Sequence, residues 1–443
     1  MRHRYLAYAA SLGILAAPLL PATAAELPAG QPSALGLSQA RLARLDATME
    51  TAVREGRLPG AVVLIARHGR VAHYKAFGIA DPATKRAMKP DDIFRIYSMT
   101  KSVVSVALMM LYEEGKFQLT DPLEKYVPGF KGLKVFAGVD DKGVMILEDA
   151  RRKPTIQDAL RHTSGLANAG TRTPVERCYL KGGVTFTKLE SLNQEIEQIG
   201  KCPLAYQPGE RWLYGKSVDV VAYLVERFSG MPLDKFLTER LFRPLGMNDT
   251  SYGVPAAKAN RIAQYGGPIA WPDPDNPALD MRPQTYERFA TRPFGTEGLW
   301  STAMDYARFS QMLLNGGKLD GVHILGKKTV ELMTQNNLPA KIGDLTATGS
   351  SGTGFGLGFS VALNAPATGN LASPGTFGWT GAATTSFMID PKEDLVAIMM
   401  AQQWPYDKPF LSEFQTMAYQ AIVDERDGAA ERALPLSPGA TRP

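Results

Sequence analysis

The sequence places a serine and a lysine at a spacing that can activate a nucleophile. Ser98 and Lys101 stand three residues apart in Ser98-Met99-Thr100-Lys101, the one S-x-x-K match in the chain. On a helix, residues i and i+3 share a face with about 5–6 Å between their Cβ atoms, so the lysine amine can reach the serine hydroxyl. Serine attacks a carbonyl only when a neighbouring group takes its proton. The pair alone is weak evidence, because a serine that only caps a helix, followed by a lysine on the helix surface, gives the same S-x-x-K pattern.

Other hydrolytic mechanisms lack their residues in this sequence. Catalytic zinc is usually held by clustered histidines or carboxylates, but no H-E-x-x-H occurs. The five histidines are scattered along the chain, at His3, His68, His73, His162 and His323. No G-x-S-x-G occurs either, which argues against the triad of an α/β-hydrolase. We therefore expect no metal and no cofactor, and we interpret His162 as a structural residue of a turn.

The surroundings of Ser98 give a much stronger signal. The run Phe94–Val103 resembles the active-site segment of the class C β-lactamase-like serine hydrolases, which include β-lactamases, D-Ala-D-Ala carboxypeptidases and family VIII carboxylesterases. Further segments resemble the family in the family's order: Pro154–Leu166, Tyr206–Tyr214, Pro244–Met247, Glu297–Thr302 and Gly378–Gly381. The resemblance implies an α/β, β-lactamase/transpeptidase-like fold, in which an antiparallel sheet flanked by helices carries a mostly helical inserted domain.

The resemblance also assigns roles to two later motifs. Tyr214 matches the tyrosine of the family's Tyr-x-Asn motif and would move the serine proton together with Lys101. Which of the two is the formal base stays open, because coupled groups titrate as a set. Where lactamases and peptidases have Lys-Thr-Gly, this chain has Trp379-Thr380-Gly381. A flat apolar group thus replaces a cation suited to a substrate carboxylate, as in the family VIII esterases.

The remaining site residues follow from the same resemblance. The backbone N–H groups of Ser98 and Ala382 are expected to form the oxyanion hole, where each donor is worth ~3–4 kcal/mol. Tyr97 and the Trp379–Gly381 strand are expected to bind substrate. Lys216 stands where the family often has asparagine, and two readings are open: a positive charge at the pocket, or a side chain in solvent.

These features favour a carboxylesterase-like enzyme that cleaves esters through acyl-Ser98. One alternative is an amide-bond enzyme of the same superfamily: a β-lactamase, a D-amino-acid peptidase or an amidase. The other is a non-catalytic sensor built on this fold. A formal net charge of +5, which includes two leader arginines, is too small to indicate nucleic acid. The expected partner is a small-molecule ester or amide.

The elements that must position these residues come from both ends of the chain. Apolar residues at helical spacing predict a helix that Ser38 caps and Gly56 ends, followed by a hairpin over 61–79. Ser98 lies at the mouth of a predicted helix over 101–114. We therefore predict an α/β domain built from two chain segments around a mostly helical domain, and then a C-terminal tail. The segments are 34–110 and 300–425, the helical domain is 111–299, and the tail is 426–443. Residues 131–152 read as a charged surface loop.

The N-terminus predicts export. Two arginines precede an apolar run, and small residues follow it up to Ala25. This is the pattern of a secretory signal peptide, so we expect residues 1–25 to be removed near Ala24 or Ala25 and the protein to be periplasmic or secreted. The alternative is a retained membrane anchor, but the run is shorter than the ~20 residues that a span needs. In an oxidising compartment, Cys178 and Cys202 either form a disulfide or remain separate buried thiols.

Overall fold

The computed structural model describes residues 26–184, 189–265, 293–404 and 406–423. The predicted signal peptide, residues 1–25, and the predicted C-terminal tail, residues 426–443, lie outside these ranges. Within them, no helix is both long and apolar enough to cross a membrane.

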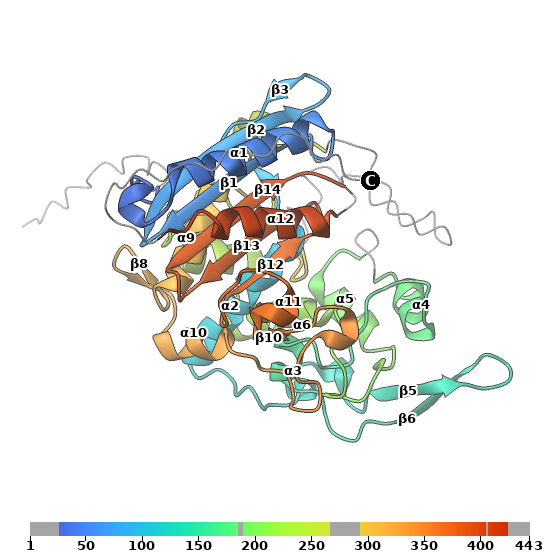
Figure 1. The fold of residues 1–443 in the computed structure, drawn as a ribbon. Coiled ribbons are helices and arrows are strands. Elements are labelled where there is room, and N and C mark those ends of the chain that lie inside the picture. The colour runs from blue at the N-terminus through green and yellow to red at the C-terminus, as the bar shows by residue number, and fades with distance from the viewer. Residues whose placement is uncertain (1–25, 185–188, 266–292, 405, 424–443) are drawn as a thin grey trace, which may run out of the picture.

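Eight strands from the two ends of the chain form one sheet (Figure 1). Its order is β10-β11-β12-β13-β14-β1-β2-β3, and every neighbouring pair is antiparallel. The N-terminal strands are β1 (Gly60–Arg67), β2 (Arg70–Asp81) and β3 (Arg86–Ala87). The C-terminal strands are β10 (Thr353–Phe355), β11 (Ser360–Ala362), β12 (Phe377–Gly381), β13 (Thr385–Asp390) and β14 (Leu395–Ala401). The two ends meet where β1 pairs with β14, in the register Val63↔Met399.

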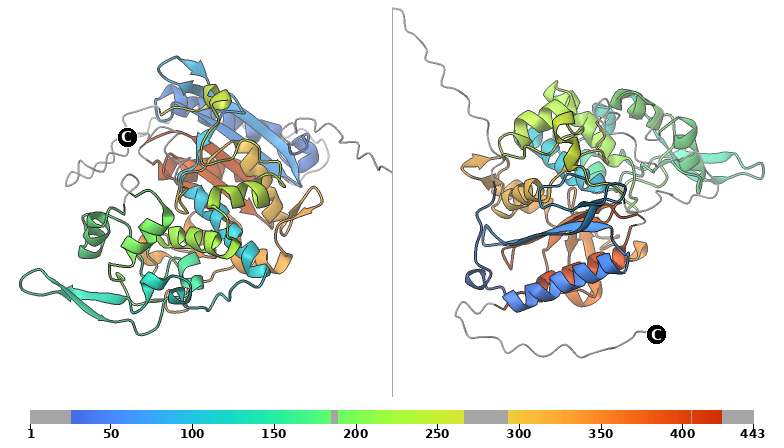
Figure 2. Two further views of the ribbon diagram at one scale, coloured as in Figure 1. Left: turned by 180° about the vertical axis from the view of Figure 1, so that it is seen from behind. Right: turned by 90° about the horizontal axis from the view of Figure 1, so that it is seen from above.

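Helices cover both faces of this sheet (Figures 1 and 2). On one face lie α1 (Gln39–Arg54) and α12 (Lys408–Tyr419), packed on alternate residues of β1 in one core cluster. Ser38 caps α1 by accepting a hydrogen bond from the Arg41 N–H, as its side-chain type predicts. On the other face lie α2 (Thr100–Glu113) and α9 (Ala303–Leu314), in a larger core cluster with the opposite residues of β1. Alternate residues of β1 thus pack into two cores, one on each face of the sheet, which is why residues 61–66 are all apolar.

The middle of the chain is mostly helical. Among the residues that the structure describes there, the α-helices are α3 (Ile156–Leu160), α4 (Pro174–Lys181), α5 (Leu192–Ile199), α6 (Ser217–Ser229) and α7 (Leu233–Leu237). Smaller elements follow along the chain: β7 (Trp300–Ser301), which pairs with β4 (Phe94–Arg95), then β8 (Lys318–Leu319), β9 (Val322–His323), α10 (Lys327–Met333) and α11 (Ala365–Thr368). One core cluster runs from the sheet through α2 into α6. The predicted fold class is confirmed, while the exact domain boundaries stay predictions.

One segment differs from its prediction. Residues 131–152, which read as a charged loop, contain a hairpin of β5 (Lys134–Val139) and β6 (Met145–Asp149) that projects from the body (Figure 1). Apolar side chains on it remain exposed, Val139 by 50% and Ile146 by 49%. Because both faces of this hairpin meet solvent over most of its length, its residues show no alternation of apolar and polar types.

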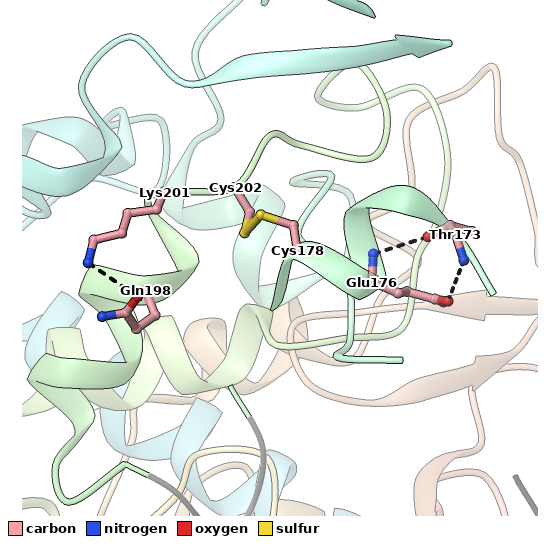
Figure 3. The surroundings of a disulfide bond; sticks show 6 residues. All are labelled: Thr173, Glu176, Cys178, Gln198, Lys201 and Cys202. Carbon is pink, nitrogen blue, oxygen red and sulfur yellow. Dashed lines mark hydrogen bonds between the residues drawn. A yellow bond between two sulfur atoms is a disulfide. The ribbon is translucent and has the colours of Figure 1, made fainter. Parts of the chain in front are cut away.

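The two cysteines form a disulfide (Figure 3). Cys178 lies in α4 and Cys202 follows α5, with their Cα atoms 5.9 Å apart. Of the two readings left open by the sequence, the disulfide is the one in the structure. The bond ties α4 to the end of α5.

Candidate active site

A tight turn presents Ser98 to solvent. The chain leaves β4 and enters α2 through a 3₁₀ turn over Tyr97–Met99. Tyr97 has φ 44°, in the left-handed region that a bulky side chain rarely adopts. Its neighbours on both sides are buried, whereas Ser98 is half-buried. Backbone strain of this kind persists where surrounding structure enforces it, often at functional sites, and here it lies next to the candidate nucleophile.

Lys101 approaches Ser98 from the first turn of α2. Its Nζ donates to Ser98 Oγ at 3.0 Å and to the carbonyl oxygen of Thr296 at 2.7 Å. The side chain is only 5% exposed, so water competes little for these contacts. When the amine is neutral, the Thr296 carbonyl can hold one N–H while the nitrogen lone pair accepts the Ser98 proton. Sequence reasoning missed Thr296, and its nearest signal was the family motif that begins at the next residue.

Tyr214 joins this pair from the loop before α6. The Lys101 ammonium lies 4.6 Å from the centroid of the Tyr214 ring. The Tyr214 hydroxyl accepts a hydrogen bond from Trp379 Nε1 at 3.3 Å. The structure therefore brings four predicted residues together: Ser98 from the turn before α2, Lys101 from α2, Tyr214 from the loop before α6 and Trp379 from β12.

Four aromatic side chains pack together beside Lys101, and we call them the aromatic wall: Trp212, Tyr214, Phe355 and Trp379. Neighbouring rings in it have centroids 5.3 to 5.9 Å apart. Three of its members, Trp212, Tyr214 and Trp379, also line a cleft of about 640 Å³ together with Thr380. A space of this size suits a small molecule.

His162 lies behind the aromatic wall. It is 1% exposed, and its ring centroid is 5.0 Å from that of Tyr214. Burial, with a smaller effect of Lys101, lowers the pKa of His162 to about 3, so the ring is neutral at neutral pH. Its φ of 58° places it in a turn, as predicted. The contact with Tyr214 was not predicted, because the two residues are far apart in the sequence.

The end of β12 is packed against the turn that carries Ser98. A Cβ atom on Gly381 would lie 2.4 Å from the carbonyl oxygen of Ile96, which is too close for any side chain. Gly381 therefore serves this close approach, and Ala382 follows it directly. Thr380, which precedes Gly381, accepts a hydrogen bond at its Oγ1 from the Tyr406 hydroxyl at 3.2 Å. The oxyanion hole at the Ser98 and Ala382 N–H groups stays a prediction.

Tyr97, expected at the substrate, is inside the protein. It is 3% exposed, the Arg95 guanidinium lies 4.3 Å from its ring centroid, and its hydroxyl bonds that of Tyr265. Its role as a substrate-binding residue is wrong, because both its ring and its hydroxyl are occupied by protein groups. The left-handed turn that exposes Ser98 sends the preceding side chain inward.

Lys216 fits neither of the two readings left open. It is 3% exposed, and its Nζ forms ion pairs with Glu195 and Asp219, at 3.0 Å each. The ammonium is neither in solvent nor presented to the pocket. The pairing with Asp219 has a signal in the sequence, because Asp219 follows Lys216 at helical spacing. The pairing with Glu195 has no such signal, because Glu195 belongs to another helix. Among the residues that the structure describes, no cluster of histidine, cysteine or carboxylate side chains could hold a metal ion.

Comparisons with known proteins show which family this chain resembles. The family model described as Beta-lactamase matches residues 45–422. Esterase EstB from Burkholderia gladioli is 28% identical over 396 residues, which cover 85% of this chain and 94% of EstB. A putative D-alanyl-D-alanine carboxypeptidase from Escherichia coli (strain K12) is 28% identical over 397 residues, 84% of each chain. The solved structure of EstCE1, a hydrolase with promiscuous acyltransferase activity, matches with a TM-score of 0.70 and 25% identity, over 86% of this chain and 99% of that one.

Proposed function

This chain belongs to the beta-lactamase family of serine hydrolases, and from that premise we propose that it is a carboxylesterase whose nucleophile is Ser98. The observation that carries the proposal is the indole of Trp379, which donates to Tyr214 beside the Ser98–Lys101 pair. A neutral ring occupies the strand position where peptidases and lactamases of the family have a lysine. A cleft with a neutral ring there favours a neutral carbonyl substrate over one that carries a carboxylate.

The geometry supports a two-step reaction. Ser98 Oγ attacks the ester carbonyl carbon while its proton passes to the Lys101–Tyr214 pair. The tetrahedral intermediate collapses, the carbon–alkoxide bond breaks, and the pair returns the proton to the leaving alcohol. A water molecule then attacks acyl-Ser98, giving its proton to the same pair. The second tetrahedral intermediate collapses, the bond between the acyl carbon and Ser98 Oγ breaks, and the pair returns the proton to Oγ as the acid leaves.

Lys216 gives a second reason to prefer an ester. The family's asparagine at this position holds an amide group of the substrate. Here the side chain is paired with Glu195 and Asp219 inside the protein, so it does not supply that donor. A substrate that lacks an acylamido group suits such a site.

We also propose that the enzyme works outside the cytoplasm. The leader-like N-terminus is one support. The Cys178–Cys202 disulfide is another, since disulfides persist in oxidising compartments. Comparing the intact mass of the protein purified from the periplasm or medium with that of the full chain tests removal of residues 1–25.

The central test is Ser98→Ala with p-nitrophenyl butyrate. We expect kcat to fall at least about 10⁴-fold, and up to the roughly 10⁶-fold loss seen when a serine hydrolase loses its nucleophile, with the fold retained by circular dichroism. Ser33→Ala, which removes an exposed hydroxyl from a 3₁₀ turn near the N-terminus, is the control and should keep wild-type activity. Intact-mass detection of an acyl group on Ser98 gives independent evidence, and full activity in Ser98→Ala would sink the proposal.

An amide-bond enzyme is the second candidate, because one relative is described as a putative D-alanyl-D-alanine carboxypeptidase. The same Ser98 chemistry would serve it. Comparing kcat/KM for a p-nitrophenyl ester, nitrocefin and a D-Ala-D-Ala peptide decides between them, and we expect the ester to be preferred. A non-catalytic sensor would follow from a failure of both hydrolysis and fluorophosphonate labelling.

A further inference from the structure

Lys216 bridges two buried carboxylates behind the active site. Its Nζ lies 3.0 Å from Glu195 Oε1 and 3.0 Å from Asp219 Oδ2. Glu195 comes from α5, and Asp219 from the first turn of α6; both are fully buried. A buried carboxylate is costly unless a cation or hydrogen-bond donors face it. Lys216 therefore allows two like charges to lie close together here.

Asp219 uses its remaining contacts to hold a backbone turn. Its Oδ1 accepts hydrogen bonds from the N–H groups of Gly295 at 2.8 Å and Thr296 at 2.9 Å. The Thr296 hydroxyl also donates to the carboxylate, at 3.0 Å. A Cβ atom on Gly295 would lie 1.9 Å from the Val218 carbonyl oxygen, so this turn sits directly on α6. Asp219 thus sets the orientation of the Thr296 peptide.

The turn that Asp219 holds is hydrogen-bonded to Lys101, the lysine of the candidate active site. The Thr296 carbonyl accepts from Lys101 Nζ at 2.7 Å, and that nitrogen reaches Ser98 Oγ at 3.0 Å. We propose that Asp219, Lys216 and Glu195 are positioning residues that fix the Lys101 amine through Thr296. This inference rests on the proposed role of Ser98 and Lys101 in ester cleavage. The three residues act through Lys101 and not on the substrate.

Electrostatics give Lys216 its part in the network. Burial alone would raise the pKa of Asp219, but the Lys216 ammonium, the Thr296 N–H and Lys101 hold it below its ordinary value. Burial alone would lower the pKa of Lys216, but Asp219 and Glu195 raise it. Both groups therefore stay charged at neutral pH. Without the ammonium, the two carboxylates would repel each other and one would take up a proton, which would weaken the hold of Asp219 on the turn.

The direct test is Asp219→Asn. The variant keeps the side-chain shape and leaves Lys216 paired with Glu195, but an amide oxygen is a weaker acceptor than a carboxylate. We expect kcat for p-nitrophenyl butyrate to fall about 10-fold or more, since small misplacements of catalytic groups are costly, with KM within two-fold of wild type. The rate of fluorophosphonate labelling at Ser98 should fall by the same factor.

Asp390→Asn is the matched control. Asp390, at the end of β13, is also fully buried and accepts hydrogen bonds from backbone N–H groups and from the hydroxyls of Thr376 and Tyr419. It belongs to a different part of the molecule from the Thr296 turn. Its removal should cost stability, but kcat per labelled Ser98 should stay within two-fold of wild type.

A single variant and a charge-balanced double variant keep the test decisive if Asp219→Asn does not fold. Lys216→Met leaves Glu195 and Asp219 facing each other, and we expect kcat per labelled site to fall about 10-fold. Adding Glu195→Gln removes that repulsion, and the double variant should return to within three-fold of wild type. A merely structural role would change the yield of folded protein without this loss and recovery of kcat.

The outcomes separate the two proposals. A folded Asp219→Asn protein with wild-type kcat per labelled Ser98 would overturn the positioning network, and so would a double variant no faster than Lys216→Met. If wild-type protein hydrolyses esters but is not labelled at Ser98, the proposed function fails instead. Labelling of the wild type therefore tells which idea is wrong.

Discussion

The candidate active site has two sides, and different forces hold them in place. On the inner side, Ser98, Lys101 and Thr296 are joined by directed hydrogen bonds of 2.7 and 3.0 Å. On the other side, the aromatic wall is held by ring contacts, with one hydrogen bond of 3.3 Å between Trp379 and Tyr214. Hydrogen bonds fix the direction of a proton, whereas ring contacts tolerate several orientations.

This difference assigns different tasks to the two sides. The inner side is suited to moving one proton along one path, and small changes there should lower kcat. The aromatic wall is suited to receiving a range of neutral groups, and changes there should alter which ester is preferred. Tyr214 belongs to the wall but contacts Lys101, so it links the two tasks.

Among the residues that move the Ser98 proton, the largest effect is expected when the Lys101 amine is removed. Lys101→Met keeps the length and apolar stem of the side chain but takes no proton from Ser98. We expect kcat to fall about 10³–10⁴-fold, toward the upper end of what general acid–base catalysis contributes. Steady-state hydrolysis of p-nitrophenyl butyrate measures it. Lys328→Met, at a lysine side chain that is 90% exposed, is the control and should be indistinguishable from wild type. A Lys101→Met enzyme within ten-fold of wild type would mean that another group takes the proton.

A smaller loss is expected at the residue that links the two sides. Tyr214→Phe keeps the ring in the aromatic wall but removes the hydroxyl that accepts from Trp379. We expect kcat to fall about 10²-fold, at the lower end of the acid–base range, with KM changed less than three-fold. Tyr406→Phe removes a hydroxyl that bonds Thr380 in the same cleft, and it should lower kcat by less than three-fold. Equal losses in the two variants would contradict a special role for Tyr214.

Sequence reasoning reached the parts of this site that are local or carried by a family motif. The i, i+3 spacing of Ser98 and Lys101 predicts a contact that the helix start then forms. Tyr214 and Trp379 were placed by motifs, and the structure brings both to the same cleft. The sheet was predictable as well, because β1 and β14 are short apolar runs of strand length.

The parts that were missed depend on distant pairs. Lys216 reads as a pocket or surface charge until Glu195 is placed beside it from another helix. The side chain of Tyr97 points inward because its backbone is left-handed, and a tyrosine in the sequence does not predict that backbone conformation. The role of Thr296 is carried by its backbone carbonyl, which any residue type would supply. A sequence lists side chains, so backbone roles and long-range ion pairs remain hidden in it.

The disulfide offers a change that touches neither side of the cleft. Cys178 and Cys202 are 24 residues apart, and closing a loop of that length stabilises a fold by about 3 kcal/mol in the chain-entropy model. We expect Cys178→Ser/Cys202→Ser to lower the free energy of unfolding by about that amount, measured by denaturant titration. At 25 °C, kcat should stay within two-fold of wild type. A large loss of kcat in this variant would show that stability and catalysis are coupled through α4 and α5.

The smallest effect, and the one specific to the aromatic wall, concerns substrate charge. Trp379→Lys restores a cation at the strand position beside Tyr214, in a half-buried place where an ion pair is worth about 1 kcal/mol or less. The test compares an anionic ester, the p-nitrophenyl hemiester of succinic acid, with neutral p-nitrophenyl butyrate. We expect kcat/KM for the anionic ester, divided by kcat/KM for the neutral ester, to rise about five-fold.

Trp379→Phe separates charge from the loss of the indole. It keeps an aromatic ring but removes the donor to Tyr214, a neutral hydrogen bond worth about 0.5–1.5 kcal/mol. Both esters should therefore slow by about two- to ten-fold, and their ratio should stay constant. A ratio that shifts as much in Trp379→Phe as in Trp379→Lys would show that wall shape, and not its neutrality, selects the substrate. The division of tasks between the two sides would then hold, but the preference for neutral esters would need another cause.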